Sequence, residues 1–211
     1  MVGVVRALGR IGRWFNPTTL ILTGICFALP FVTVSCDTPG GYGRGAPGAT
    51  TTYNGVDLAI GGEPDVAPPE RVRPLPPGVD DRLWLPATTV VLVLLVAGTV
   101  LAVTVPDRRV RRASLAALAG VAATALLVGQ ALAEAELAVR VGEQLTQPLP
   151  VGKSPRDYVR TGPGFVLALA LLLSLAVVNG VGWLRARPRP ALVALPDGDD
   201  DTVRQPPPTV T

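Results

Sequence analysis

The chain alternates between long apolar runs without charge and polar stretches rich in glycine and proline. Three runs, Leu85–Val105, Ala113–Ala133 and Gly164–Leu184, are each 21 residues long and contain no charged side chain. Because a helix rises about 1.5 Å per residue and the hydrocarbon core of a bilayer is about 30 Å thick, each run is long enough to cross a membrane. A shorter run, Thr18–Val34, has 17 residues and contains Pro30. The pattern predicts an all-α membrane protein with four transmembrane helices.

The ends of these runs carry residues that are typical of helix starts and membrane interfaces. Asn16 followed by Pro17 predicts an N-cap and a first helical residue before the first span. All three tryptophans, Trp14, Trp84 and Trp183, stand at span ends, where an aromatic ring with one polar edge is favoured.

Arginine residues gather at alternate ends of the spans. They precede the first span, fill the turn between the second and third, and follow the fourth: Arg6, Arg10, Arg13, Arg108, Arg109, Arg111, Arg112, Arg185, Arg187 and Arg189. A four-span chain brings these three sites to one side, and the positive-inside rule places that side in the cytoplasm. We therefore expect a multi-pass protein of the cell membrane with both termini in the cytoplasm.

The spans divide the rest of the chain into three inner and two outer segments. The inner segments are residues 1–17, 106–112 and 185–211, and the last has no apolar periodicity, so a disordered tail is expected. The outer segments are residues 35–84 and 134–163. In the second of these, Leu137 and Val141 continue the helical spacing of the third span to about Leu145.

A β-hairpin is predicted in the first outer segment, over residues 49–60. β-Branched and aromatic residues flank Asn54-Gly55, a pair that suits a type I′ turn because both turn residues need a positive φ. The alternating stretch Phe31–Ser35 offers a third strand where the first span ends. Tyr53 and Asp57 flank the turn, which makes them the candidate contacts for a partner; packing of Tyr53 on the helix ends and capping by Asp57 are the alternative.

The two cysteines are expected in different surroundings. Cys26 lies within the first span as an apolar packing residue, whereas Cys36 lies beyond its outer end as a candidate exposed thiol, too far from Cys26 for a disulfide. The string Thr33–Cys36 after an arginine-rich, apolar stretch also resembles a lipoprotein signal. Lipidation of Cys36 would leave three spans, and an intermolecular disulfide is a further alternative.

Residues that support catalysis or metal binding are scarce. The chain has no histidine and only two cysteines, and the spans contain no ionisable side chain. We therefore expect no catalytic residue, cofactor or metal. The polar residues of the spans, among them Gln130 and Asn179, are typical of hydrogen bonds between helices, with a role in transport as the alternative.

Two strings resemble a known group of proteins. Leu29-Pro-Phe-Val-Thr-Val-Ser-Cys36 and Tyr53-Asn-Gly-Val-Asp-Leu58 are similar to strings in small four-span membrane proteins of high-GC Gram-positive bacteria. In that group a first helix ends in a Pro-aromatic-Val-Ser stretch, and the outer loop carries a Tyr-x-Gly-x-Asp-Leu string. The resemblance implies the four-span layout and no particular activity.

Two functions are consistent with these features. The first is a non-enzymatic membrane protein of the cell envelope that acts as a scaffold or binds protein partners through its outer loop or cytoplasmic tail. The alternative is a transporter subunit or a component of a small-molecule permease. In either case the lipid bilayer is a partner, a homo-oligomer is compatible with the sequence, and no nucleic acid is expected.

Overall fold

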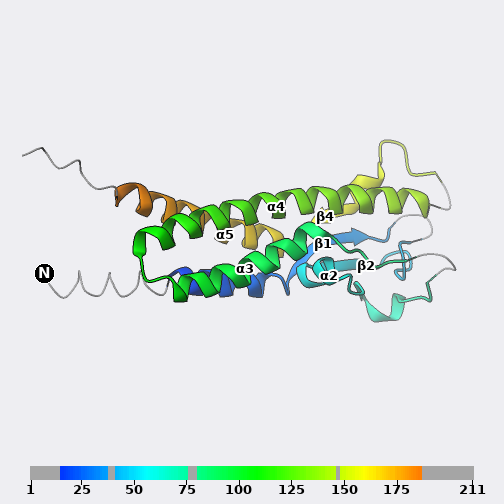
Figure 1. Cartoon of the computed structure of the whole chain (residues 1–211). Helices are drawn as coiled ribbons and strands as arrows, with labels where there is room; N and C mark the ends of the chain where they lie inside the picture. Colours follow the sequence, from blue (N-terminus) through cyan, green and yellow to red (C-terminus); the bar gives the residue numbers. More distant parts are fainter. Residues whose placement is uncertain (1–14, 38–40, 76–79, 146–147, 187–211) are drawn as a thin grey trace, which may run out of the picture.

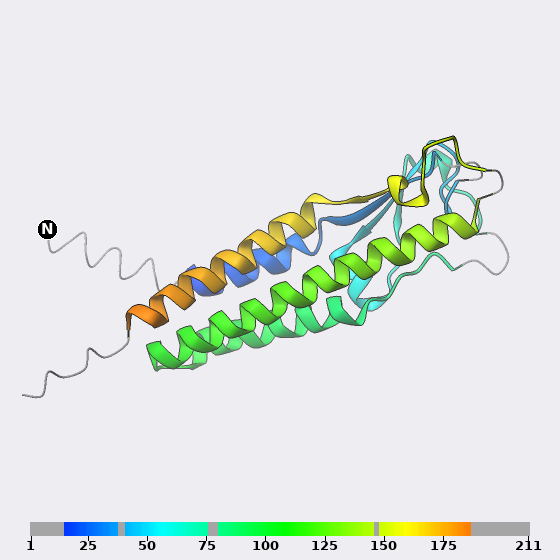
Figure 2. The same ribbon diagram turned by 90° about the horizontal axis from the view of Figure 1, so that it is seen from above.

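A bundle of long helices carries a small antiparallel sheet at one end in the computed structural model (Figures 1 and 2). The structure describes residues 15–37, 41–75, 80–145 and 148–186. Residues 15–26 are helical and form the first helix of the bundle. The long helices that follow are α3 (Pro86–Thr104), α4 (Arg108–Glu143) and α5 (Pro163–Arg185).

Three helices of the described chain, α3, α4 and α5, are long and apolar enough to cross a membrane. Their outward faces are apolar, with Val96, Val103 and Val177 each more than half exposed. Exposed valines on this scale are compatible with a lipid environment and costly in water. The chain is thus a multi-pass membrane protein by helix length and composition, with three supported spans rather than the four that we expected.

The bounds of α3 and α5 agree with the predicted second and fourth spans to within one residue at each end, and α4 contains the predicted third span, 113–133, and extends beyond it on both sides. Continuation of the third span past Ala133 is also confirmed, because α4 runs without interruption to Glu143. The predicted inner loop 106–112 is too long, since α4 begins at Arg108. Asp107 caps it by accepting the backbone N–H of Arg109 at 2.7 Å and that of Val110 at 3.4 Å.

The predicted first span, 18–34, is wrong in its second half. The helix ends at residue 26, and the chain then forms strand β1 (Pro30–Ser35). Pro30 cannot continue a helix, and the β-branched residues after it favour a strand. Asn16 lies within the first helix rather than before it. The N-terminal segment 1–14 and the tail from residue 187, including its predicted disorder, lie outside the described residues.

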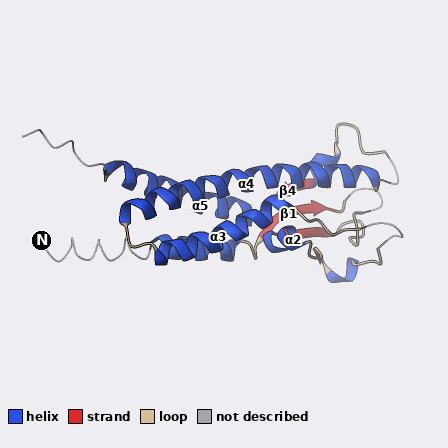
Figure 3. Cartoon of the chain, in the orientation of Figure 1, coloured by secondary structure: helices blue, strands red, loops and turns tan. Residues whose placement is uncertain are grey.

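The sheet joins segments that are far apart in the sequence. Its strands are β1, β2 (Thr50–Asn54), β3 (Asp65–Ala67) and β4 (Val159–Thr161), in the order β3-β2-β1-β4 with antiparallel pairing. Figure 3 shows these strands grouped at one end of the helices. Strand β1 therefore holds together the first outer segment and the segment before α5.

Three short helical elements complete this end of the molecule: α2 (Gly55–Ile60) and the 3-10 helices η1 (Pro69–Arg71) and η2 (Pro155–Tyr158). We call the sheet, these elements and the last turns of α4 the cap. Phe31 joins the cap to the bundle, with its ring centroid 4.9 Å from that of Phe27 and 6.3 Å from that of Phe165. The core is therefore continuous from the helices into the sheet.

The predicted hairpin 49–60 is wrong. Residues 50–54 form β2, but Gly55 begins helix α2 instead of a second hairpin strand, and β2 pairs with β1 and β3. Asn54 caps α2, accepting the backbone N–H of Asp57 at 2.8 Å. The predicted third strand, 31–35, is present and is the central partner of β2.

Candidate functional site

The candidate contact residues Tyr53 and Asp57 do not form an exposed tip. Tyr53 is fully buried in the cap, where its hydroxyl donates to the backbone oxygen of Asp81 at 2.6 Å. Its oxygen lies 3.3 Å from the hydroxyl of Tyr42. Burial raises the pKa of both phenols, so neither is a base near neutral pH. Tyr53 is therefore not an exposed contact residue in the folded cap, and packing within the cap accounts for its position.

Asp57 organises the start of α2. Its carboxylate accepts the backbone N–H of Asn54 at 3.3 Å, and the Asn54 side chain in turn accepts the backbone N–H of Asp57. These two hydrogen bonds form a capping box. Burial raises the pKa of Asp57, while the hydrogen bonds from Asn54 oppose this shift. The geometry corresponds to the alternative interpretation of Asp57, a carboxylate that caps its own segment.

Cys36 is buried rather than exposed. Its exposed fraction is 0%, and its sulfur lies 3.4 Å from the hydroxyl oxygen of Thr51. Gly45 permits this burial, because a Cβ at that position would come within 2.4 Å of the sulfur. Both cysteines are free, as expected for a chain in which they cannot reach each other. A thiol in this position reports whether the cap is closed.

A charged cluster that the sequence reasoning missed lies beside Tyr53. The carboxylate of Asp81 is buried, and it accepts the Nε–H of Arg44 at 2.8 Å. Arg44 also contacts Glu63 at 2.9 Å, and Glu63 contacts Arg82 at 2.9 Å. Hydrogen bonds to Asp81 and Glu63 raise the pKa of Arg44, and those from Arg82 and Arg44 lower the pKa of Glu63. Every charge of the cluster is thus paired, which favours a structural role over catalysis.

Arg140 ties the same segment to α4. Its guanidinium donates to the backbone oxygens of Asp80 at 3.1 Å and of Arg82 at 3.0 Å, and it pairs with Glu136 at 2.9 Å. Gln144 continues the connection by accepting the backbone N–H of Gly43 at 2.8 Å. The end of α4 is therefore fastened to the part of the cap that precedes α3. The sequence signal for this was the continued helical spacing beyond the third span.

Polar side chains inside the bundle mostly pair with each other or with their own helix. Asn16 and Asn179 form two reciprocal amide bonds, at 3.1 and 3.0 Å, between the first helix and α5. Thr23 and Thr124 donate to carbonyl oxygens four residues earlier. These bonds agree with the predicted role in packing between and within helices. The polar groups of these side chains are thus already hydrogen-bonded, whereas a transport path would need polar groups that are free to contact a substrate.

Gln130 is the exception near the cap. It donates to Glu134 at 2.8 Å, and Thr161 donates to the same carboxylate at 2.6 Å. The amide oxygen of Gln130 is buried without a protein donor among the described residues. Within the described chain, no group of three or more acidic or cysteine side chains is placed to hold a metal ion.

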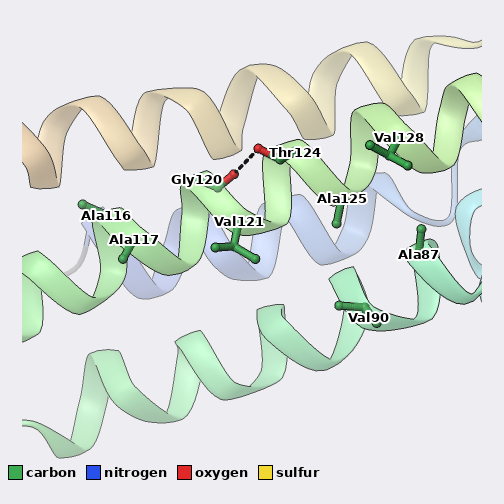
Figure 4. A pocket seen from close by; sticks show the side chains of 9 residues that line it. All are labelled: Ala87, Val90, Ala116, Ala117, Gly120, Val121, Thr124, Ala125 and Val128. Atoms are coloured by element: carbon green, nitrogen blue, oxygen red, sulfur yellow. Dashed lines mark hydrogen bonds between the residues drawn. The ribbon is translucent and has the colours of Figure 1, made fainter.

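Hollows lie along α4 on different parts of the molecule, and two of them are large enough to consider as binding sites. One, of about 730 Å³, lies between α3 and α4 and is lined by small apolar side chains and Thr124 (Figure 4): Ala87, Val90, Ala116, Ala117, Gly120, Val121, Thr124, Ala125 and Val128. It belongs to the membrane-crossing part of both helices. The other, of about 430 Å³, lies in the cap between α4 and the segment around η2: Ala135, Ala138, Val139, Gly142, Ser154, Pro155 and Arg156.

The hollow in the cap combines an apolar floor with a basic rim. Val139 is more than half exposed, and Ala135 one turn earlier is exposed beside it. Arg156 is exposed at the edge of the hollow. An apolar side chain next to a carboxylate would fit this arrangement. We therefore take this hollow as the candidate binding site of the cap.

Comparison with protein-family models, with curated proteins and with solved structures found no match to this chain. Its function is therefore inferred from the geometry of the molecule itself.

Proposed function

We propose that the chain is a non-enzymatic membrane protein of the cell envelope that acts as a scaffold and binds a protein partner through its cap. The observation that carries this proposal is the construction of the cap. Its sheet joins the chain before α3 to the segment before α5, the Arg44–Asp81 pair connects two parts of the cap, and Arg140 fastens the cap to α4. A cap held in this way presents a fixed surface, and a preorganised surface binds with a lower entropic cost.

The proposal includes four spans with both termini in the cytoplasm. Near the start of the first helix, Asn16 pairs with Asn179, which lies six residues before Arg185 at the end of α5. The other end of the first helix, at residue 26, lies next to the cap, where Phe27 accepts the backbone N–H of Val56. The described part of the first helix therefore runs along most of the bundle. Arg108–Arg112 and Arg185 lie at the bundle end opposite the cap, which the positive-inside rule assigns to the cytoplasm. The cap is then outside the cell.

The proposed partner segment lies in the hollow between α4 and η2. It would place an apolar side chain against Ala135 and Val139 and a carboxylate near Arg156. The permease alternative has weaker support, because Asn16, Asn179, Thr23 and Thr124 use their polar groups in bonds within the bundle. The resemblance to small four-span proteins of high-GC Gram-positive bacteria is compatible with this proposal.

Photocrosslinking in native membranes tests the binding site. A photoreactive amino acid at Val139 should give a crosslinked adduct with a partner protein, and one at Val72, an exposed cap residue outside the hollow, should not. Ala135→Trp, which fills the hollow from an exposed helical position, should remove the adduct. Glu143→Trp, on the same helix but outside the hollow, is the matched control and should leave it unchanged. Equal adducts at Val139 and Val72, or an adduct that survives Ala135→Trp, would contradict the proposal.

A further inference from the structure

Helix α2 lies across the cap-side ends of two helices of the bundle. The backbone N–H of Val56, in its first turn, donates to the carbonyl oxygen of Phe27 at 3.1 Å, just after the first helix. At its other end, the carbonyl oxygen of Leu58 accepts the backbone N–H of Leu85 at 2.7 Å, just before α3. Figure 1 shows α2 nearly end-on, while the long helices run across the view. Its axis is therefore directed across the bundle rather than along it.

The height of α2 relative to a bilayer follows from α3. This helix has 19 residues, so it is about 28 Å long, close to the thickness of about 30 Å of the hydrocarbon core. A helix of this length places its first turn at the boundary between acyl chains and headgroups. Because Leu58 is bonded to Leu85 and the hydroxyl of Thr89 donates to Ala59, α2 lies at the same level.

One side of α2 is apolar and uncovered. Val56 and Ile60 are four residues apart, on the same face of the helix, and are 37% and 70% exposed. Trp84 beside them is 61% exposed. Its indole N–H donates to the carbonyl oxygen of Ala59 at 3.0 Å, so the exposed ring has no need of water as a hydrogen-bond partner.

Apolar side chains are also exposed on the two helices that α2 contacts. Ile25, near the end of the first helix, is 60% exposed, and Val93 in α3, one turn after the Thr89 that bonds to Ala59, is 62% exposed. The outward faces of membrane-crossing helices contact lipid. An exposed apolar helix side held between two such helices, at the level of the acyl boundary, favours the same contact.

We propose that α2 and Trp84 are inserted into the leaflet on the side of the cap, with Val56, Ile60 and the indole ring of Trp84 among the acyl chains close to the headgroups. The occupant of this surface is lipid at the boundary between headgroups and hydrocarbon. At the helix start, the backbone N–H of Asp57 is bonded to Asn54 and that of Val56 to Phe27, so neither donor needs water as a partner in this layer. Insertion anchors the cap on one side, and it requires only the membrane spans, not the proposed partner.

Depth-dependent fluorescence quenching tests this insertion. The full chain with Trp14→Phe and Trp183→Phe keeps Trp84 as its only tryptophan and is reconstituted into phosphatidylcholine vesicles brominated near the headgroup or near the end of the acyl chain. We expect a blue-shifted emission, stronger loss of emission with bromine near the headgroup than with deep bromine, and weak quenching by aqueous acrylamide.

Two further variants place a tryptophan at matched positions after Trp84→Phe is added. Ile60→Trp should repeat the quenching pattern of Trp84. Val151→Trp, at a fully exposed cap residue (104%), should be quenched by acrylamide and not by brominated lipid. Slow labelling of Cys36 in each variant verifies that the cap is folded. Quenching of Trp84 and Ile60→Trp by acrylamide alone would overturn the proposal, and so would protection from both quenchers, which would indicate cover by protein.

Discussion

Neutralising Asp81 should open the cap, and Cys36 provides the measurement. The carboxylate of Asp81 is 1% exposed and accepts a charged hydrogen bond from Arg44. Loss of one partner of a fully buried pair costs about 3–5 kcal/mol. In Asp81→Asn, Arg44 is not left as a buried unpaired charge, because its side chain is 25% exposed and still pairs with Glu63. The cost is therefore that of one lost hydrogen bond to a charged group, about 1.5–3 kcal/mol. We therefore expect Asp81→Asn to lower the free energy required to open the cap by about 2 kcal/mol.

The assay is the rate at which a membrane-impermeant thiol reagent labels Cys36 in intact cells, in a Cys26→Ala background. Because the wild-type sulfur is fully buried, labelling requires opening of the cap, and its rate is proportional to the population of open molecules. A change of about 2 kcal/mol then corresponds to labelling that is about 30-fold faster.

Glu70→Gln, at an exposed carboxylate on η1, is the matched control and should label at the wild-type rate. Arg44→Gln should accelerate labelling to a similar extent, and the double variant should be less affected than the sum of the two, because both changes remove the same pair. If wild-type Cys36 labels as fast as an exposed thiol, or if Asp81→Asn labels no faster than Glu70→Gln, the Arg44–Asp81 pair does not hold the cap closed and the reasoning is refuted.

Three further predictions concern the topology, the bundle and the start of α2. Reporter fusions after Arg13, Gly62, Val110, Gly152 and Thr211 should read inside, outside, inside, outside, inside; an outside result at Val110 would contradict the four-span proposal. Asn179→Leu should lower the melting temperature in detergent, because it leaves the amide of Asn16 unpaired at a cost of about 1–2 kcal/mol, and Asn16→Leu in addition should recover part of the loss. Asn54→Ala should cost about 1 kcal/mol by removing the N-cap, while Asn54→Ser should be nearly neutral since serine caps equally well. Equal loss in both Asn54 variants would indicate a turn with positive φ instead.

The spans were predictable because their signal is local. An uncharged run of 21 residues has few alternatives to a membrane helix, and the structure moves the bounds of α3 and α5 by one residue at each end. The first span was different, because its 17-residue run combined helix and strand signals. Pro30 and the alternation after it marked the change, but hydropathy alone does not distinguish a membrane helix from a short helix followed by a buried strand.

The candidate site was less predictable because it depends on contacts between distant segments. Asp81 stands in a stretch of mixed charge whose sequence is typical of a solvated loop, yet its partners come from residue 44 and, through its backbone, from Tyr53. The hollow between α4 and η2 also needs two segments that only the folded chain brings together. Spacing along one segment predicts which face of a helix is apolar, but it does not predict which loop covers that face.

The Asn54-Gly55 pair shows how tertiary contacts select between two local structures. The same residues suit a type I′ turn or the start of a helix, since asparagine is favoured in both. In the cap, a Cβ on Gly55 would lie 2.8 Å from the rings of Phe27 and Phe31, so this glycine serves close packing rather than a positive φ. The hairpin would place Val56 and Leu58 on the same face of one strand, so that both would be buried or both exposed. The helix instead buries Leu58 against the bundle and leaves Val56 and Ile60 together on the outer side. In a chain whose neighbouring surface is lipid, burial of Leu58 and exposure of that apolar pair are both favourable, which accounts for the helix at this position.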